Sequence, residues 1–358
     1  MSTLFTPLTI GSQTFRNRAW VSPMCQYSAV NGLFQDWHAV HYGAFITGGA
    51  GLVMVEATAV APEGRITQSC LGIWTDKHAQ LIAEVPEFAH RHGTKAGIQL
   101  AHAGRKGSSQ VSWAGAGATT VPHSDGGWQS IAPSAVAFEG YDTPAEMSLS
   151  QIAEVTEQFV AAAKRAVNIG FDVIEIHAAH GYLLHEFLSP ISNVRTDNYG
   201  GSFDNRIRLL CEIATQVRAV VPKDRMLMVR ISATDWIDGG WDVEQSIGLA
   251  RELHARGVEM IDCSSGGLSL QQKIELKPGY QVDFARAIAQ ATGIPVCAVG
   301  LITTGTQAQD IVADGDVSAV MIGRAMLGNP RWPLQAAADL GEEVPWPNQY
   351  ARGFLKRD

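Results

Sequence analysis

Residues 171–206 read FDVIEIHAAHGYLLHEFLSPISNVRTDNYGGSFDNR, and the rest of the chain is best understood from them. Phe171–Ile176 is an apolar run with β-branched residues and the length of a strand, which predicts a buried strand. His177, His180 and Tyr182 follow it directly, and a polar segment broken by Gly and Pro comes next. In barrels of alternating strands and helices, catalytic groups lie at the carboxyl ends of the strands. The stretch therefore predicts a strand of a parallel α/β protein that ends in a functional site.

Seven further runs of this kind occur along the chain, and helical patterns separate most of them. The eight predicted strands lie near Ala19, Met54, Ile98, Ile174, Val229, Ile261, Cys297 and Met321. Strands that are buried on both faces read as continuous apolar runs, as these do. Eight such units predict an α/β fold, a (β/α)8 TIM barrel in which residues 1–358 form a single domain. A doubly wound sheet is the alternative, but no Gly-rich nucleotide fingerprint follows the first strand.

The regular alternation fails between residues 103 and 143, after the third predicted strand. Gly, Ser, Pro and Trp dominate there, with Trp113 and Trp128 as isolated aromatics. A loop of this length is usually functional or has structure of its own, so we expect either a lid or a small hairpin. The two tryptophans either line a pocket or anchor the loop. Regular order resumes at Ser148, which with Gln151 forms a predicted helix capping box.

The composition favours a globular protein and excludes several classes of partner. Hydrophobic residues make up 46% of the chain and charged residues 17%, which is enough apolar material for a large core. A formal charge of −8 disfavours nucleic acid and anionic membrane surfaces as partners, and no apolar run has the length of a membrane span. The five cysteines show no Cys-x-x-Cys spacing, and no signal peptide is visible. We therefore expect a soluble, cytoplasmic protein without an iron–sulfur cluster.

The motifs of the opening stretch resemble the signature of the old yellow enzyme family, the flavin-dependent alkene reductases. The matching elements are His177-x-x-His180-Gly-Tyr182, Leu188-Ser-Pro, Arg195-Thr-Asp, Tyr199-Gly-Gly and Asn205-Arg206. The resemblance spans nearly the whole chain and implies the same barrel. Cys25 and the pair of histidines resemble the bacterial branch of xenobiotic reductases and NADPH dehydrogenases. The resemblance implies tightly bound, non-covalent FMN as the cofactor and NADPH or NADH as the reductant.

By this resemblance, the ends of the predicted strands bind FMN. The implied cofactor-binding residues are Pro23, Met24, Cys25, Ala57, Gln99, Arg230, Gly300, Gly323 and Arg324. The last three follow strands seven and eight, where barrels commonly bind phosphate. Arg230 and Gln99 would face the pyrimidine edge of the flavin, and Cys25 would lie beside N5 and tune the redox potential. Each residue also has a plainer interpretation, as a turn glycine, a surface ion pair or a small buried side chain.

For the reaction, the resemblance implies ping-pong reduction of the activated C=C bond of α,β-unsaturated carbonyl compounds, with hydride delivered from flavin N5. His177 and His180 would hydrogen-bond the carbonyl oxygen, Tyr182 would donate a proton, and Tyr27 would contact the substrate. Nitro compounds and nitrate esters are further implied substrates. The alternative is that the histidines are satisfied core residues or form a metal site with His185. No nearby carboxylate or thiol completes a metal site, so we expect none.

The C-terminal segment, residues 345–358, adds a predicted partner. Gln349-Tyr350-Ala-Arg352-Gly resembles the tail by which one subunit of this branch reaches the site of its neighbour. This implies a homodimer or homotetramer in which Arg352 acts across the interface, whereas on its own Arg352 is an exposed tail residue. Two other functions stay open. One is a dienoyl-CoA-reductase-like enzyme without the cluster domain, and the other is a non-catalytic barrel that binds flavin or phosphate.

Overall fold

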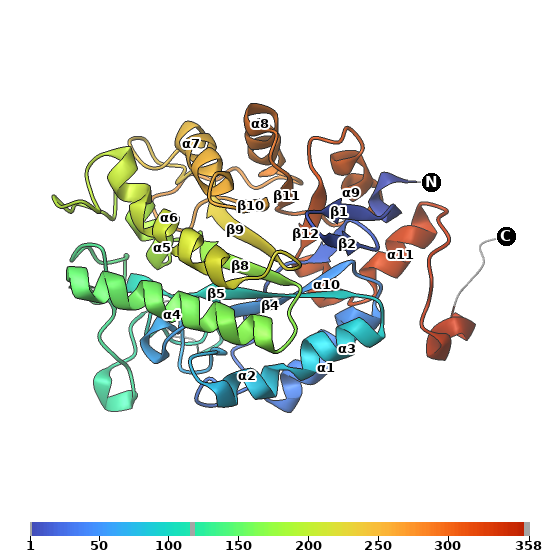
Figure 1. Cartoon of the computed structure of the whole chain (residues 1–358), viewed down its shortest axis with the longest axis horizontal. Helices are drawn as coiled ribbons and strands as arrows, with labels where there is room; N and C mark the ends of the chain where they lie inside the picture. The colour runs from blue at the N-terminus through green and yellow to red at the C-terminus, as the bar shows by residue number, and fades with distance from the viewer. Residues whose placement is uncertain (1, 115–118, 354–358) are drawn as a thin grey trace.

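A closed barrel of eight parallel strands forms the centre of the computed structural model, which describes residues 2–114 and 119–353 (Figure 1). The barrel strands are β3 (Ala19–Val21), β4 (Leu52–Ala59), β5 (Lys95–Ala101), β8 (Val173–Ala178), β9 (Met226–Ser232), β10 (Met260–Ser264), β11 (Val296–Val299) and β12 (Ala319–Ile322). Each strand pairs with the next along the chain, and β12 pairs with β3 to close the ring. All eight predicted strands are present, so the predicted TIM barrel is confirmed and the doubly wound sheet is wrong.

Helices surround the barrel and connect its strands (Figure 1). They are α1 (Asp36–Thr47), α2 (Asp76–Ile82), α3 (Glu84–Arg91), α4 (Leu149–Asn168), α5 (Leu183–Leu188), α6 (Phe203–Val220), α7 (Val243–His254), α8 (Val282–Thr292), α9 (Gly305–Val312), α10 (Arg324–Gly328) and α11 (Trp332–Asp339). The capping box predicted at Ser148 begins α4, because its hydroxyl accepts the Gln151 N–H and the Gln151 side chain accepts the Ser148 N–H. None of the helices in the described residues has the length and hydrophobicity that a membrane span requires.

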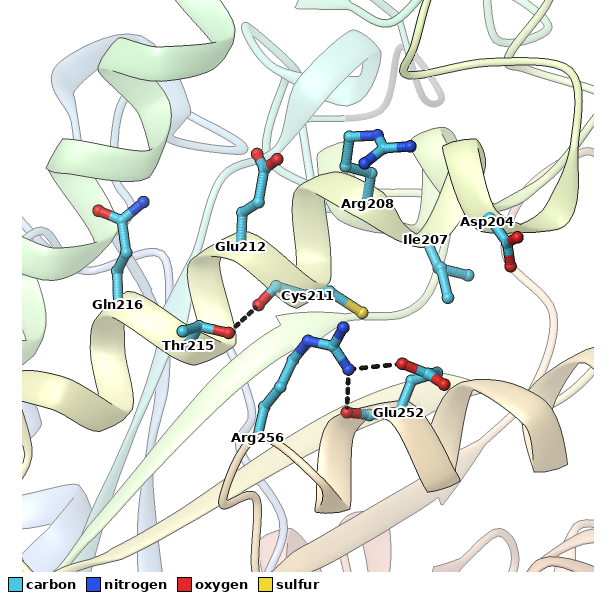
Figure 2. A pocket seen from close by; sticks show the side chains of 9 residues that line it. All are labelled: Asp204, Ile207, Arg208, Cys211, Glu212, Thr215, Gln216, Glu252 and Arg256. Atoms are coloured by element: carbon cyan, nitrogen blue, oxygen red, sulfur yellow. Dashed lines mark hydrogen bonds and ion pairs between the residues drawn. The ribbon is translucent and has the colours of Figure 1, made fainter.

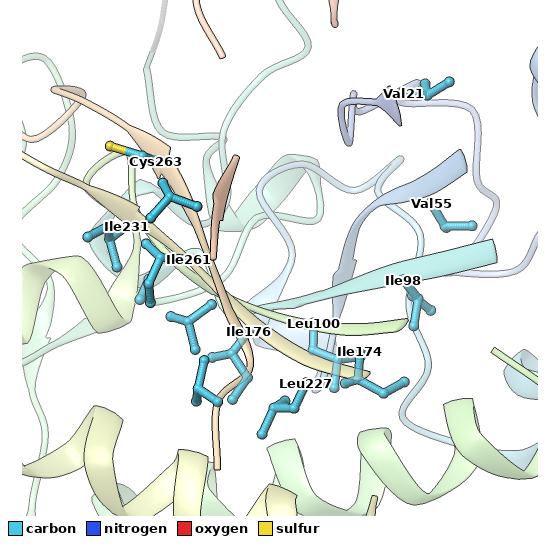
Figure 3. Packing of buried hydrophobic residues seen from close by; sticks show 14 of the residues in the cluster. Val21, Val55, Ile98, Leu100, Ile174, Ile176, Leu227, Ile231, Ile261 and Cys263 are labelled. Carbon is cyan, nitrogen blue, oxygen red and sulfur yellow. The ribbon is translucent and has the colours of Figure 1, made fainter. Parts of the chain in front are cut away.

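Alternate residues of the barrel strands face two different cores. Outward-facing side chains such as Ile98, Ile174 and Ile261 pack in the layer between the barrel and its helices (Figure 3). Inward-facing side chains, among them Val173 and Met228, fill the barrel interior with apolar volume. The hairpin of β1 (Leu8–Ile10) and β2 (Gln13–Phe15) adds Ile10 and Phe15 to this inner cluster. Toward the carboxyl ends of the strands the inward-facing residues become polar, and the candidate site lies at this end.

The irregular segment after β5 is fastened to the barrel at several points. It contains η3 (Gly104–Lys106), η4 (His123–Asp125) and β6 (Ile131–Ala132). Strand β6 pairs in parallel with β7 (Ala145–Glu146), so the two strands do not form a hairpin. Trp128 anchors the segment, because its Nε1–H donates to the Glu63 carbonyl at 2.9 Å. Trp113 is 66% exposed and meets the ring of Tyr27 edge-on at 5.6 Å, so the two tryptophans have different roles.

Part of the signature holds loops together. The Arg195 guanidinium pairs with Asp197 at 2.6 Å and also donates to the carbonyls of Pro133 and Met147 at 2.8 and 2.7 Å. It thereby ties the loop after α5 to the irregular segment and to the start of α4. An arginine that satisfies three loop acceptors from a buried position explains the Arg-Thr-Asp motif structurally, without a role in chemistry.

Candidate active site

The end of β8 brings two imidazoles and a phenol together. His177 lies in the strand, His180 in the turn that follows, and Tyr182 at the N-cap of α5. The ring centroid of His177 is 5.1 Å from that of His180 and 5.2 Å from that of Tyr182, both in edge-on arrangements. The three residues predicted as catalytic therefore form one cluster.

Three neighbouring elements fix His180 in an unusual backbone conformation. Its φ of 60° is left-handed, which is strained for a residue with a Cβ. Its N–H donates to Ser232 Oγ at 2.9 Å, its Nε2 lies 2.6 Å from Ser264 Oγ, and its carbonyl accepts from Lys106 Nζ at 2.8 Å. Strands β9 and β10 and the turn η3 thus hold the imidazole in place and offset the strain.

Burial sets the protonation states of this cluster. It lowers the pKa of both His177 and His180 well below 6.5, and the Arg230 charge lowers both further. Burial also raises the pKa of the Tyr182 phenol well above 10. At neutral pH the histidines are therefore uncharged hydrogen-bonding groups and the tyrosine keeps its proton. The Nδ1 of His177 is buried without a hydrogen-bond partner among the described residues, so it can bond to a ligand.

A pocket of about 380 Å³ opens beside this cluster. Its lining includes Tyr27, Lys106, Phe138, Tyr141, Tyr182 and Leu270. Tyr27 and Tyr182 lie far apart in the sequence, and both line this one cavity. Such a mixture of aromatic and aliphatic walls with a few hydroxyl and cationic groups is typical of small-molecule sites.

Lys106 is a pocket residue that the sequence analysis did not single out. Its ammonium donates to the carbonyls of His180 and Gly267 and lies over the rings of Phe138 and Tyr182, at 4.4 and 5.4 Å from their centroids. Burial lowers its pKa from 10.5 to about 8. Its position shortly after barrel strand β5 could have indicated a site residue. It falls, however, within the segment where the regular pattern of the sequence fails.

The residues predicted to bind a cofactor gather around the same end of the barrel. Ser22 N–H donates to the Ile322 carbonyl at 3.1 Å, so Pro23–Cys25 after β3 lie next to Gly323 and Arg324 after β12. Arg324 is exposed there. Gly300 directly follows β11 with a φ of 121°, a conformation that only glycine adopts without strain.

Gln99 and Arg230 lie inside the barrel, where the apolar interior gives way to polar groups. They are only 2% and 5% exposed. Arg230 donates to Ser22 Oγ at 3.1 Å, and the amide nitrogen of Gln99 donates to Glu175 at 2.6 Å. The pairing register of β4 shifts between Val55 and Ala57, so that Ala57 is the residue opposite Gln99. A β-bulge of this kind re-aims the side chains that follow it.

The thiol of Cys25 interacts with the thiol of Cys70 and the carboxyl of Glu56. Its hydrogen bond with Cys70, followed by burial, raises its pKa, so the thiol keeps its proton. Burial also acts on Cys70, but hydrogen bonds from Cys25 and Thr67 outweigh it and lower the pKa of Cys70 to about 7. Gln26, the residue after Cys25, donates its backbone N–H to the buried carboxyl of Glu56 at 2.9 Å. The position of the loop after β3 and the protonation of the Cys25 thiol therefore depend on Glu56 and Cys70, which do not line the pocket.

Arg352 is not brought to the pocket of its own chain. It is an exposed residue of η5 (Asn348–Gly353), near the C-terminal end that Figure 1 shows beyond α11. Residues 354–358 of the predicted tail lie outside the described residues. No group of three His, Cys, Asp or Glu side chains in residues 2–114 and 119–353 is arranged to hold a metal ion.

A second depression, of about 590 Å³, lies on the outside of the barrel between α6 and α7 (Figure 2). Arg256 is paired with Glu252 at 2.6 Å in its wall. Burial raises the pKa of Cys211 to about 11, so its thiol stays protonated there. The groove contains none of the residues at the strand ends, so the pocket beside Tyr182 is the candidate site.

Comparison with known proteins gives consistent results. The model of the NADH:flavin oxidoreductase / NADH oxidase family matches residues 3–343. The chain is 46% identical to an NADPH dehydrogenase of Bacillus subtilis over 98% of this chain and 99% of the relative. It is 45% identical to an NADH:flavin oxidoreductase of Gibberella zeae over 99% and 90% of the two chains.

Solved structures of similar proteins agree. Morphinone reductase is 28% identical, with a TM-score of 0.79 over 97% of this chain and 92% of its own. The old yellow enzyme homologue from Zymomonas mobilis is 27% identical, with a TM-score of 0.77 over 96% and 94% of the two chains.

Proposed function

From the premise that the chain belongs to the NADH:flavin oxidoreductase / NADH oxidase family, we propose that this FMN-dependent NAD(P)H oxidoreductase reduces the activated C=C bond of α,β-unsaturated carbonyl compounds. The observation that supports this most is the cluster of two neutral imidazoles and one protonated phenol beside a single pocket. The imidazoles can donate hydrogen bonds to a carbonyl oxygen, and the phenol is a weak acid that can protonate a carbon. This combination suits the addition of hydrogen across a polarised alkene. Nitro compounds and nitrate esters are proposed as secondary substrates.

The residues at the strand ends suit FMN in their chemistry and in the space they leave. A Cβ on Gly323 would meet only Met24 Sδ at 3.5 Å and Ser22 Cβ at 3.9 Å, so the backbone there can approach a ligand closely. We propose that Gly300, Gly323 and Arg324 bind the phosphate group. The proposed contacts of the flavin ring are Pro23, Met24, Cys25, Ala57, Gln99 and Arg230. When bound, FMN supplies the two-electron chemistry, accepting hydride from NAD(P)H and delivering it to the alkene.

The side chains around the pocket are proposed to act on the substrate in three ways. His177 and His180 donate hydrogen bonds to the carbonyl oxygen and stabilise the negative charge that develops on it. Tyr182 then gives its phenolic proton to the α-carbon, and the ammonium of Lys106 stabilises the phenolate that remains. Tyr27, which also lines the pocket, contacts the substrate.

We further propose that Arg352 acts in the pocket of a neighbouring subunit of a homodimer or homotetramer. Its exposure and its absence from the lining of the pocket of its own chain support this. A chain truncated after Tyr350 should bind substrate or cofactor more weakly. Kinetics equal to those of the full chain would contradict the proposal, and size-exclusion chromatography with light scattering tests the assembly itself.

An anaerobic cycle followed by visible spectroscopy tests the main proposal. The purified protein should be yellow, lose its colour with NADPH, and recover it when cyclohexenone is added. A protein that loses its colour but does not recover it with the enone would contradict alkene reduction while leaving the FMN-dependent reduction intact. A CoA thioester in place of cyclohexenone separates the dienoyl-CoA alternative. A protein that binds FMN but shows no turnover, and in which Tyr182→Phe changes nothing, would favour a non-catalytic barrel.

A further inference from the structure

The polar layer of the barrel interior contains more charge than the proposed reaction uses. Four of its side chains come from β5, β8, β9 and β10: Gln99, Glu175, Arg230 and Asp262. All are 5% exposed or less, and both carboxyls are 0% exposed. Gln99 and Arg230 are proposed flavin contacts, but Glu175 and Asp262 have no role in the reaction described above.

Contacts divide these side chains into two linked pairs. The amide nitrogen of Gln99 donates to Glu175 Oε1 at 2.6 Å, and Arg230 Nε lies 3.2 Å from Asp262 Oδ2. The carboxyls of Glu175 and Asp262 are close enough to interact directly, and the Cys297 thiol lies beside Asp262. The second oxygen of Glu175, Oε2, and both oxygens of Asp262 are buried and accept no hydrogen bond from the described residues.

The charges of this layer do not balance if both carboxyls are ionised. One guanidinium would then face two carboxylates in mutual contact, sealed from water, and like charges in contact at low dielectric cannot both persist. Two carboxylate oxygens also cannot bond to each other without a hydrogen between them. Burial raises the pKa of both carboxyls, and the Asp262 charge raises that of Glu175 further, whereas the Arg230 charge opposes the rise at both groups. The layer therefore retains a proton at neutral pH.

We propose that Glu175 and Asp262 hold one proton between them, and that this carboxyl pair sets the charge and hydrogen-bond direction behind the pyrimidine edge of the flavin. The contacts place the proton on Glu175, because Asp262 is the partner of Arg230. Glu175 is thus a positioning residue that acts through Gln99. Because its Oε1 takes the amide nitrogen of Gln99, the Gln99 carbonyl oxygen is left for the ligand. This inference rests on the proposed FMN site.

Sharing one proton has a consequence for substitutions. Glu175→Gln keeps both hydrogen bonds, because an amide can accept from Gln99 and donate to Asp262, and it leaves the net charge unchanged. Asp262→Asn also leaves it unchanged, since Glu175 then ionises against Arg230. Only the double variant leaves Arg230 without a counter-charge. The pair therefore predicts a strongly non-additive double-mutant cycle.

The experiment measures the two-electron reduction potential of bound FMN in the holoprotein, the two single variants and the double variant. Each single variant should change the ratio of reduced to oxidised flavin at a fixed potential by less than about twofold. The double variant should raise it about tenfold, or about 30 mV, because an uncompensated cation favours the reduced flavin. Glu157→Gln, which removes an exposed carboxylate on α4, is the matched surface control and should change nothing.

Tenfold shifts in both single variants would show that both carboxyls are ionised and would overturn the proposal, as would an unchanged potential in the double variant. Infrared spectroscopy covers the case in which the double variant does not fold. The Glu175→Gln variant should lose one band of a protonated carboxylic acid relative to the natural chain, and retention of that band would also overturn the proposal. The infrared result does not need FMN, so a failure of the proposed function is distinguishable from a failure of this inference.

Discussion

Raising the pH from 7 to 10 should move the stability and the activity of this protein in opposite directions through Lys106. Burial lowers the pKa of the ammonium from 10.5 to about 8, so between these values the unfolded chain binds more protons than the folded chain. Stability therefore rises with pH in this window through this group. The change corresponds to about 3 kcal/mol, since a tenfold change in proton affinity is worth about 1.4 kcal/mol.

Activity should fall over the same window, because the ammonium is proposed to stabilise the phenolate of Tyr182. The ammonium lies 5.4 Å from the centroid of that ring. At an effective dielectric constant of about 20, a unit charge at this separation contributes about 3 kcal/mol, which corresponds to a loss of up to about a hundredfold in the proton-transfer step. Reoxidation of the reduced enzyme by cyclohexenone, followed by stopped flow, should slow with an apparent pKa near 8.

Two substitutions isolate the effect. Lys106→Arg keeps a cation at every accessible pH, so the decline near pH 8 should disappear. Lys106→Met removes the titrating group. The difference in unfolding free energy between the natural chain and this variant, measured by urea unfolding at each pH, isolates the contribution of Lys106 from that of other titrating groups such as Cys211. A reoxidation rate that declines equally in the natural chain and in Lys106→Arg would refute the reasoning, as would stability differences that do not depend on pH.

Three further predictions follow from single contacts. Tyr182→Phe should slow reoxidation by an enone about 10² to 10⁴-fold while reduction by NADPH stays within about twofold, and equal slowing of both half-reactions would argue against proton donation. Ser264→Ala removes the partner that lies 2.6 Å from His180 Nε2, and should lower kcat/KM for the enone about tenfold, with recovery in Ser264→Thr. Burial raises the pKa of Glu56 to about 8, so stability should fall between about pH 4.5 and 8 by at most about 5 kcal/mol, a loss that Glu56→Gln should remove in urea titrations at several pH values.

The barrel could be predicted from the sequence because its strands are buried on both faces. Runs such as those around Ile174 and Val229 are apolar without interruption, and eight of them leave few alternative folds. The His177, His180 and Tyr182 cluster could be predicted because all three residues lie at or directly after the end of one buried strand, where barrels place catalytic groups. The features that depend only on the order of the strands along the chain could therefore be predicted.

The features that could not be predicted depend on where a side chain points within a strand or loop. The bulge in β4 decides that Ala57 rather than Glu56 stands opposite Gln99. Glu56 is the one charged residue of the run and lies at the register shift, but a charged residue in a strand does not by itself reveal a bulge. Glu175 lies in a predicted strand, but its contact with Asp262 depends on the inward direction of both residues. Lys106 belongs to a segment without periodicity. The proposed role of Arg352 depends on a second chain, about which a single sequence holds no physical constraint.

Burial explains why the proposed chemistry divides between imidazoles and a phenol. Burial, and after it the charge of Arg230, lowers the pKa of both His177 and His180, so neither can store a proton at neutral pH, and each can only offer a hydrogen bond. Burial acts in the opposite sense on Tyr182, whose neutral form is the protonated one. Burial thus favours the uncharged form of all three side chains, and among them the phenol is the one that holds an acidic hydroxyl proton in that form. This is why Tyr182, rather than either histidine, is the proposed proton donor to the carbon.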